Sequence, residues 1–262
     1  MRRAFTLTEM LVTVAIIGIL MLLVFPAYHY IHTHALSVVA INNLRQLTIA
    51  NMNYAADHER YVPSSNSADT WYWCGKKTGA EYDPTKGLLS DYLGKDRRVI
   101  ADPLFTRLLD RQGKVSSFSI GCGGYGYNTY LGGMDGWEFS AEHNDWMSKS
   151  MTLAQVRRLS STVMFGTTAL AKAKGVQEYP FLVPPYWPGD DGNPSRFLGR
   201  PTPSLHFRFN NKALVSWCDG HVSYEKMEAR SAGYNPYGGD AGENKLGWFG
   251  PDEGNGYWNP NR

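Results

Sequence analysis

The sequence has little net charge and few cysteines, and each feature limits the classes of function that the protein can have. It holds 26 Lys and Arg against 24 Asp and Glu, so its formal net charge is only +2 at pH 7. Because nucleic-acid binding needs a basic surface, we expect no nucleic-acid partner. The three cysteines, Cys74, Cys122 and Cys218, show no CxxC spacing of the kind that holds a metal. They can form one intramolecular disulfide at most, and the sequence leaves the pair open.

Charge is absent altogether from one stretch near the N-terminus. No charged side chain occurs from Met10 to Tyr28, and nearly all residues in this stretch are apolar. A helix of this length is roughly 28 Å long, close to the hydrocarbon thickness of a bilayer. The stretch therefore predicts a single membrane span. Arg2 and Arg3 precede it, and the positive-inside rule then predicts a cytoplasmic N-terminus and an exported remainder.

The order of the N-terminal parts differs from that of a secretory signal peptide. Such a peptide places its apolar segment before a small-residue cleavage site, whereas Ala4 precedes the apolar segment here. Cleavage after Ala4 would leave Phe5 at the head of a retained helix. Glu9 begins that helix, where a carboxylate is costly without a cation. The free amine of Phe5, in the same chain or in a neighbouring subunit, is one such cation. Stabilisation by the helix dipole alone is the alternative.

This arrangement resembles the N-terminal signature of type IV prepilins and of the pseudopilins of type II secretion. The resemblance implies cleavage after Ala4 by a prepilin peptidase, methylation of the Phe5 amine, and packing of the helices into a filament core. Glu9 would then neutralise the Phe5 amine of an adjacent subunit. Gly18 and Pro26 fall where pilin helices carry a Gly and a Pro, and the segment between them is expected to loosen on assembly. Ala4 departs from the family, which more often has Gly there.

The same resemblance implies partners and a location. The partners are other pilin-like subunits, the prepilin peptidase, an assembly platform protein, a motor ATPase and the inner membrane. The protein would be a single-pass inner-membrane protein with a periplasmic head, and would then enter a periplasmic or extracellular filament. No enzyme activity, catalytic residue or cofactor is expected.

Beyond the apolar stretch, the helical pattern continues with one buried face. The residues of this face recur at spacings of three and four, and they are Ala40, Leu44, Leu47, Asn51 and Tyr54. Pro63 predicts a helix end before it, at about His58. The expected organisation is a leader (1–4), an apolar half of the helix (5–28), an amphipathic half (29–60) and an exported globular head (61–262). The expected fold class is α+β and pilin-like, with the long helix packed on a small antiparallel β-sheet with long loops.

One hairpin stands out in the head. Asp219 and Gly220 lie between two β-rich runs and predict a two-residue turn with positive φ at both positions. The resulting register would place Cys218 opposite His221. A thiol beside an imidazole could act as a catalytic nucleophile, but an ordinary cross-strand pair explains the two residues more simply.

Residues 209–222 resemble the C-terminal motif of a group of prepilin-like proteins, in which a His is followed by nine residues and then Asp-Gly. Phe209 occupies the His position here. The stretches Asn42–Leu47, Tyr125–Asn128 and Leu246–Pro251 resemble that group as well.

Two acidic, Gly-rich loops offer oxygen ligands to calcium. One contains Asp190 and Asp191, and the other contains Asp240, Glu243 and Asp252. Pseudopilins of the major type bind calcium in a C-terminal loop, so the resemblance makes the second loop a weak calcium candidate. Neither loop has EF-hand spacing, and solvated turns are the simpler interpretation.

The aromatic share of 13% leaves a second class of function open. Aromatic clusters at residues 71–73 and 186–187 would suit stacking on sugars in a membrane-tethered periplasmic glycan-binding or enzymatic domain with a prepilin-like anchor. Burial in the core of the head explains the same clusters as readily. The residues do not distinguish a surface pilus from a secretion pseudopilus.

Overall fold

The chain divides into two compact units, Met1–Val38 and Val39–Arg262. The fold is that of a computed structural model, which describes residues 6–79, 81–94, 97–113, 123–133, 136–186, 203–230, 238–251 and 253–261. Of the predicted site residues, Ala4, Phe5, Cys122, Asp190, Asp191 and Asp252 lie outside these ranges.

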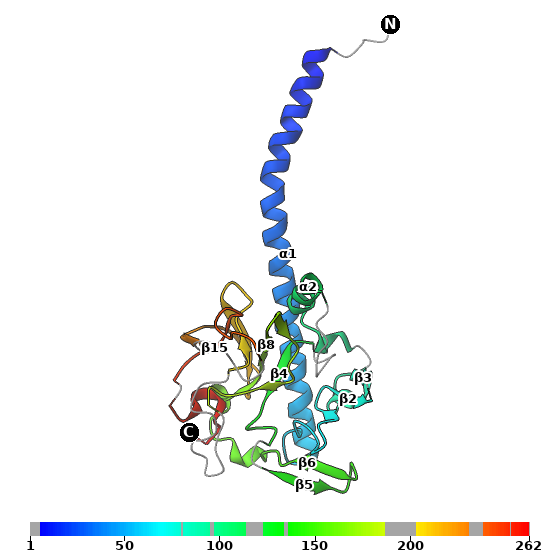
Figure 1. Cartoon of the computed structure of the whole chain (residues 1–262), viewed down its shortest axis with the longest axis vertical. Coiled ribbons are helices and arrows are strands. Elements are labelled where there is room, and N and C mark those ends of the chain that lie inside the picture. Colours follow the sequence, from blue (N-terminus) through cyan, green and yellow to red (C-terminus); the bar gives the residue numbers. More distant parts are fainter. Residues whose placement is uncertain are drawn as a thin grey trace. The chain divides into compact units, whose positions relative to one another are not determined.

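Helices and strands both contribute to the second unit, as the α+β prediction requires (Figure 1). The described α-helices are α1 (Leu7–His58) and α2 (Pro103–Gln112). The described strands are β1 (Trp71–Tyr72), β2 (Gly75–Thr78), β3 (Glu81–Asp83), β4 (Tyr125–Asn128), β5 (Trp137–Ser140), β6 (Asp145–Ser148), β7 (Val163–Thr167), β8 (Leu170–Lys172), β9 (Gly175–Gln177), β10 (Phe181–Leu182), β11 (Leu205–His206), β12 (Lys212–Trp217), β13 (Val222–Lys226), β14 (Ala229–Arg230) and β15 (Leu246–Trp248). Short 3-10 turns are η1 (Pro84–Lys86), η2 (Ser90–Tyr92), η3 (Arg97–Ile100), η4 (Leu153–Gln155), η5 (Leu159–Ser161) and η6 (Glu253–Trp258).

The C-terminal part of α1 buries the face that its spacing predicts. All five predicted face residues, Ala40, Leu44, Leu47, Asn51 and Tyr54, are buried. Arg45, Gln46 and Asn53, which fall off this face, are exposed. The helix ends at His58, in agreement with the end expected from Pro63.

A five-stranded sheet with the order β10-β4-β7-β12-β13 packs against this part of α1. Its pairs are antiparallel except for β10 and β4, which are parallel. Four smaller sheets accompany it among the described residues. The expectation of one small antiparallel sheet is therefore wrong. The parallel pair forms because the segment before β10 approaches β4 and the Pro180 carbonyl accepts the Tyr127 N–H at 2.9 Å.

Polar contacts fix the position of α1 on the sheet. Thr48 donates a 2.7 Å hydrogen bond to Ser216 Oγ on β12. Asn43 Nδ2 donates to the Tyr125 hydroxyl at 3.3 Å, and Asn51 Oδ1 accepts the Val62 N–H at 3.0 Å. Buried polar groups with partners of this kind specify one packing arrangement.

The opposite face of the sheet is covered by the C-terminal segment. Val215 and Trp217 of β12 belong to a second apolar cluster, with Phe249 and Trp258 from the end of the chain. Leu214, which directly precedes Val215 in the strand, faces the α1 cluster. Helix, sheet and C-terminal segment thus form three layers, and both faces of β12 are buried.

The β12–β13 hairpin differs from the prediction by one residue of register. Ser216 pairs with Val222, and the loop between Trp217 and His221 has three residues. Gly220 has φ of 97° and Asp219 does not have positive φ, so the loop has only one left-handed residue. Cys218 therefore lies in the loop and does not pair with His221. His221 Nδ1 instead contacts Asp219 Oδ1 at 2.6 Å, and the expected pairing of the Cys218 thiol with the His221 imidazole is absent from this hairpin.

Helix α2 was not predicted, although its start carries a clear signal. Asp102 caps the helix by accepting the N–H groups of Leu104 and Phe105 at 2.8 and 3.1 Å, and Pro103 occupies the first helical position. The other carboxylate oxygen of Asp102 accepts from Arg208 Nη2 at 2.8 Å, and both side chains are almost fully buried.

Further hydrogen-bonding and charged groups surround the buried pair of Asp102 and Arg208. Arg208 Nη2 also donates to the Gly124 carbonyl at 2.6 Å. Burial, together with the charges of Arg208 and Lys245, holds the pKa of His206 well below its usual range, so this imidazole is neutral. The ion pair ties α2 to the loop before β12.

Candidate functional site

The start of α1 is a capping box. Thr6 Oγ1 accepts the Glu9 N–H at 3.3 Å, and Glu9 Oε2 accepts the Thr6 N–H at 2.9 Å. The Thr6 hydroxyl also donates to Glu9 Oε2 at 2.7 Å. This is the reciprocal pattern expected for a Thr followed three residues later by a Glu, and it explains why the helix begins at Leu7.

The capping box uses only one oxygen of Glu9. Among the described residues, none donates to Oε1, and the side chain is exposed. Glu9 therefore caps its own helix through Oε2, and its pairing with the Phe5 amine stays a prediction. One carboxylate can satisfy both interpretations, because Oε2 stabilises the helix end while Oε1 is available for an ion pair.

Apolar side chains surround α1 in the first unit. Met10, Leu11 and Val12 are 61%, 66% and 53% exposed, and successive residues are about 100° apart around a helix. The exposed apolar side chains continue through Ile16, Ile17, Ile19, Leu20, Met21 and Leu22. A helix that is apolar all round requires an apolar environment on every side.

The predicted membrane span from Met10 to Tyr28 is not confirmed by this structure. Across the part of the chain that the structure describes, no helix is long and apolar enough to cross a membrane.

Gly18 and Pro26 lie within α1, which is helical throughout this region. Apart from the adjacent residues and the backbone of the helix itself, no atom of the described residues lies within 4 Å of the position that a Cβ would take at Gly18. Loosening of the segment between Gly18 and Pro26 on assembly stays a prediction.

The calcium candidates do not form a site in the described part of the chain. Asp240 Oδ1 accepts the Glu243 N–H at 2.9 Å, which makes this segment a self-capped turn. No group of three or more His, Cys, Asp or Glu side chains is placed to hold a metal among the residues covered by the structure.

The two described cysteines are buried free thiols. Cys74 and Cys218 are not joined in a disulfide, and Cys74 Sγ contacts the Tyr82 hydroxyl at 2.9 Å. Burial raises the pKa of the Cys218 thiol, which disfavours the nucleophilic thiolate.

Of the two explanations that the sequence leaves open for the 71–73 cluster, stacking on sugars or burial in the core, the structure supports burial. Trp71 is half-buried and Tyr72 and Trp73 are fully buried, so this cluster belongs to the core. Three exposed rings lie on the β5–β6 hairpin, near the end of α1 (Figure 1), where Trp137, Phe139 and Trp146 are each about half exposed. The alternation of Trp137 and Phe139 around Glu138 is the sequence signal that could have identified them.

These three rings share one face of the hairpin. Phe139 pairs with Trp146, and the two rings meet edge to face at 6.0 Å. The charged side chains of the two strands, Glu138 and Asp145, alternate onto the other face. The exposed face is therefore aromatic and uncharged.

Comparison with known families gives a match at the N-terminal end of the chain. No curated protein and no solved structure matches the chain. The resemblance at residues 209–222 lies beyond the matched region and stays a prediction. Residues 1–25 match the prokaryotic N-terminal methylation motif, and the N-terminal end of this chain is therefore that of a prepilin-like protein, a substrate for prepilin peptidase.

Proposed function

We propose that the protein is a structural subunit of a filament, of the type IV pilus or the type II secretion pseudopilus kind. The observation that carries this proposal is the first unit, in which a methylation motif includes the start of a helix whose apolar side chains are exposed on all sides. Other copies of the same helix would provide the apolar environment that this surface requires.

Assembly depends on Glu9 in this proposal. Cleavage after Ala4 creates a positive amine on Phe5, and Glu9 Oε1 of a neighbouring subunit accepts it. An ion pair inside an apolar bundle is favourable only when both charges have partners, so the pair selects one axial offset between subunits. No catalytic residue takes part.

The proposed location and partners follow from this assembly. The apolar part of α1 anchors the unassembled subunit in the inner membrane, and the head lies in the periplasm. A platform protein and a motor ATPase then move subunits into the filament. The resemblance at residues 209–222 supports the further proposal that the head belongs to the group with the C-terminal Asp-Gly motif.

Mass spectrometry of the native protein tests the first step. We expect the mature chain to begin at a methylated Phe5, without residues 1–4. An Ala4→Gly variant should be processed at least as completely, since Gly is the more frequent residue there in the family. A native protein that retains Met1–Ala4 would contradict the proposal. Electron microscopy of cells with and without the protein then identifies the filament as a surface pilus or a pseudopilus.

A second candidate function is supported by the aromatic face of the β5–β6 hairpin. Exposed, uncharged rings suit a neutral sugar, whose C–H groups stack on aromatic surfaces. In this candidate the prepilin-like segment is an anchor, and the head is a glycan-binding domain.

Affinity electrophoresis of the full-length chain through gels with a neutral β-glucan tests this candidate. We expect Trp146→Ala to weaken retention by about tenfold, the effect of losing about 1.4 kcal/mol of binding free energy at an aromatic contact. Leu153→Ala is the matched control, because Leu153 is also exposed and apolar but lies off the hairpin. Equal retention of both variants and the parent chain would exclude a glycan role for this face.

A further inference from the structure

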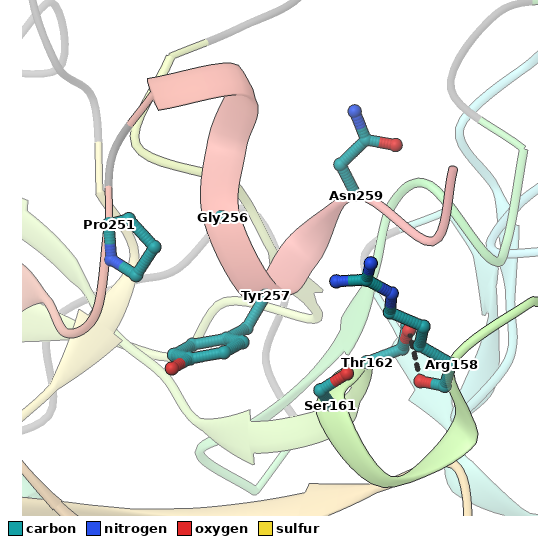
Figure 2. A pocket seen from close by; sticks show the side chains of 7 residues that line it. All are labelled: Arg158, Ser161, Thr162, Pro251, Gly256, Tyr257 and Asn259. Carbon is teal, nitrogen blue, oxygen red and sulfur yellow. Dashed lines mark hydrogen bonds between the residues drawn. The ribbon is translucent and has the colours of Figure 1, made fainter. Parts of the chain in front are cut away.

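A small cleft lies between η5 and the C-terminal segment. Figure 2 shows Arg158, Ser161 and Thr162 on one wall and Pro251, Tyr257 and Asn259 on the other. The cleft has a volume of about 250 Å³. This is below the roughly 300–1,000 Å³ of sites for drug-sized ligands, so it fits one small ring or the end of a longer chain.

Three polar groups of these walls have no partner in the described part of the chain. The Arg158 guanidinium makes no ion pair, and the hydroxyls of Ser161 and Tyr257 make no hydrogen bond, with any described residue. Asn259 uses one amide hydrogen on the Gly254 carbonyl at 3.1 Å and keeps the second. The cleft thus presents a positive charge and several hydrogen-bonding groups.

The first wall is rigid. Thr162 Oγ1 and the Ser161 N–H both donate to the Arg158 carbonyl, at 2.8 and 3.2 Å. The Thr162 carbonyl accepts the Cys218 N–H at 2.9 Å, which fastens the wall to the β12–β13 loop. The backbone below the guanidinium is therefore fixed before any ligand binds.

The second wall is held by buried amides. Asn128 Nδ2 donates to the Trp258 carbonyl at 2.9 Å, and Asn255 Nδ2 donates to the Tyr130 hydroxyl at 2.9 Å. Gly254 and Asn255 are both left-handed, with φ of 58° and 61°, and a Cβ at Gly256 would collide with the Pro251 carbonyl oxygen. Such a backbone persists only where the surroundings enforce it, and it often marks functional sites.

Aromatic packing orients the ring that lines the cleft. Phe249 stacks on Tyr257 with ring centroids 5.6 Å apart, and Trp217 meets the Tyr257 ring edge to face at 5.4 Å. Tyr257 therefore offers a fixed apolar surface close to the free guanidinium.

We propose that this cleft binds an acidic sugar, a single pyranose unit that carries a carboxylate. The planar guanidinium of Arg158 matches a carboxylate with two parallel hydrogen bonds. Ser161 and Asn259 supply hydrogen bonds to sugar hydroxyls, and Tyr257 supplies a surface for the C–H groups of the ring. The residues of this site belong neither to the N-terminal helix nor to the hairpin face, so the site depends on neither proposed function.

Titration calorimetry of the full-length chain in detergent, with glucuronate as the probe, tests the site. We expect glucuronate to bind. Glucose lacks the carboxylate and acetate lacks the sugar ring, so each should bind at least about tenfold more weakly. Arg158→Ala should weaken glucuronate binding by at least about tenfold, and Arg158→Lys by about three- to tenfold, since Lys keeps the charge but loses the planar fork.

Arg157→Ala is the matched control, because Arg157 is exposed, as its neighbour Arg158 is, but does not line the cleft. It and Trp146→Ala should leave the glucuronate affinity within about twofold. Absence of glucuronate binding, equal binding of acetate or glucose, or equal losses in Arg158→Ala and Arg157→Ala would each overturn the proposal.

Discussion

Replacing Glu9 with Gln is expected to remove the protein from filaments while cleavage after Ala4 continues. Gln can still accept the Thr6 N–H, so the capping box and the helix start survive. The negative charge is lost, however, and the Phe5 amine of the neighbouring subunit would enter the bundle unpaired, which costs several kcal/mol. We expect the filament fraction to fall by at least about tenfold, measured by shearing, fractionation and immunoblotting.

Thr6→Ala is the matched control for this variant. It removes the Thr6 side chain from the capping box, at about 1 kcal/mol of helix stability, but leaves the Glu9 charge in place. Assembly should persist. If Thr6→Ala lost filaments to the same extent as Glu9→Gln, helix capping would be the function of Glu9 and the ion-pair mechanism would be refuted.

Replacing Arg208 with Met is expected to destabilise the second unit by about 3–5 kcal/mol, the usual cost of leaving one buried charge without its partner. Asp102 is fully buried, and Arg208 is its partner in the buried ion pair. The free energy of unfolding is measured by urea denaturation of the full-length chain in detergent, followed by tryptophan fluorescence.

A double variant separates the charge effect from a packing effect. Asp102→Asn keeps a good N-cap for α2 while removing the charge, so Asp102→Asn combined with Arg208→Met should recover part of the loss. Arg111→Ala, at an exposed position in the last turn of α2, should change stability by less than about 0.5 kcal/mol. A double variant as unstable as the sum of its single variants would argue against a coupled buried pair.

Local patterns in the sequence predicted the elements that depend on nearby residues. The buried face of α1 follows from the 3.6-residue period of its apolar residues. The hairpin register was missed because turn length depends on the backbone at Cys218 and Asp219, which the Asp-Gly signal does not determine. The parallel pairing of β10 with β4 depends on contacts between distant residues, which no local pattern records.

The same distinction applies to the sites. The N-terminal motif is contiguous, so its residues could be identified from the sequence alone. The match at residues 1–25 confirms its prepilin-like character. The cleft is assembled from Arg158 and from Tyr257 and Asn259, about a hundred residues later, and only the fold brings them together. The hairpin rings were overlooked because aromatic content alone does not distinguish an exposed Trp137 from a buried Trp73.

The distribution of apolar side chains around the first unit restricts how copies can associate. A pair of such helices would cover one side of each and leave the remainder in water, unlike a coiled coil, which has a single hydrophobic seam. For the proposed filament, we therefore expect dimers and other small soluble oligomers to be poor assembly intermediates. We expect each subunit to transfer directly from a lipid-like environment into an assembly large enough to bury all sides of its helix. The growing end of that assembly should therefore stay in contact with the lipid-like environment.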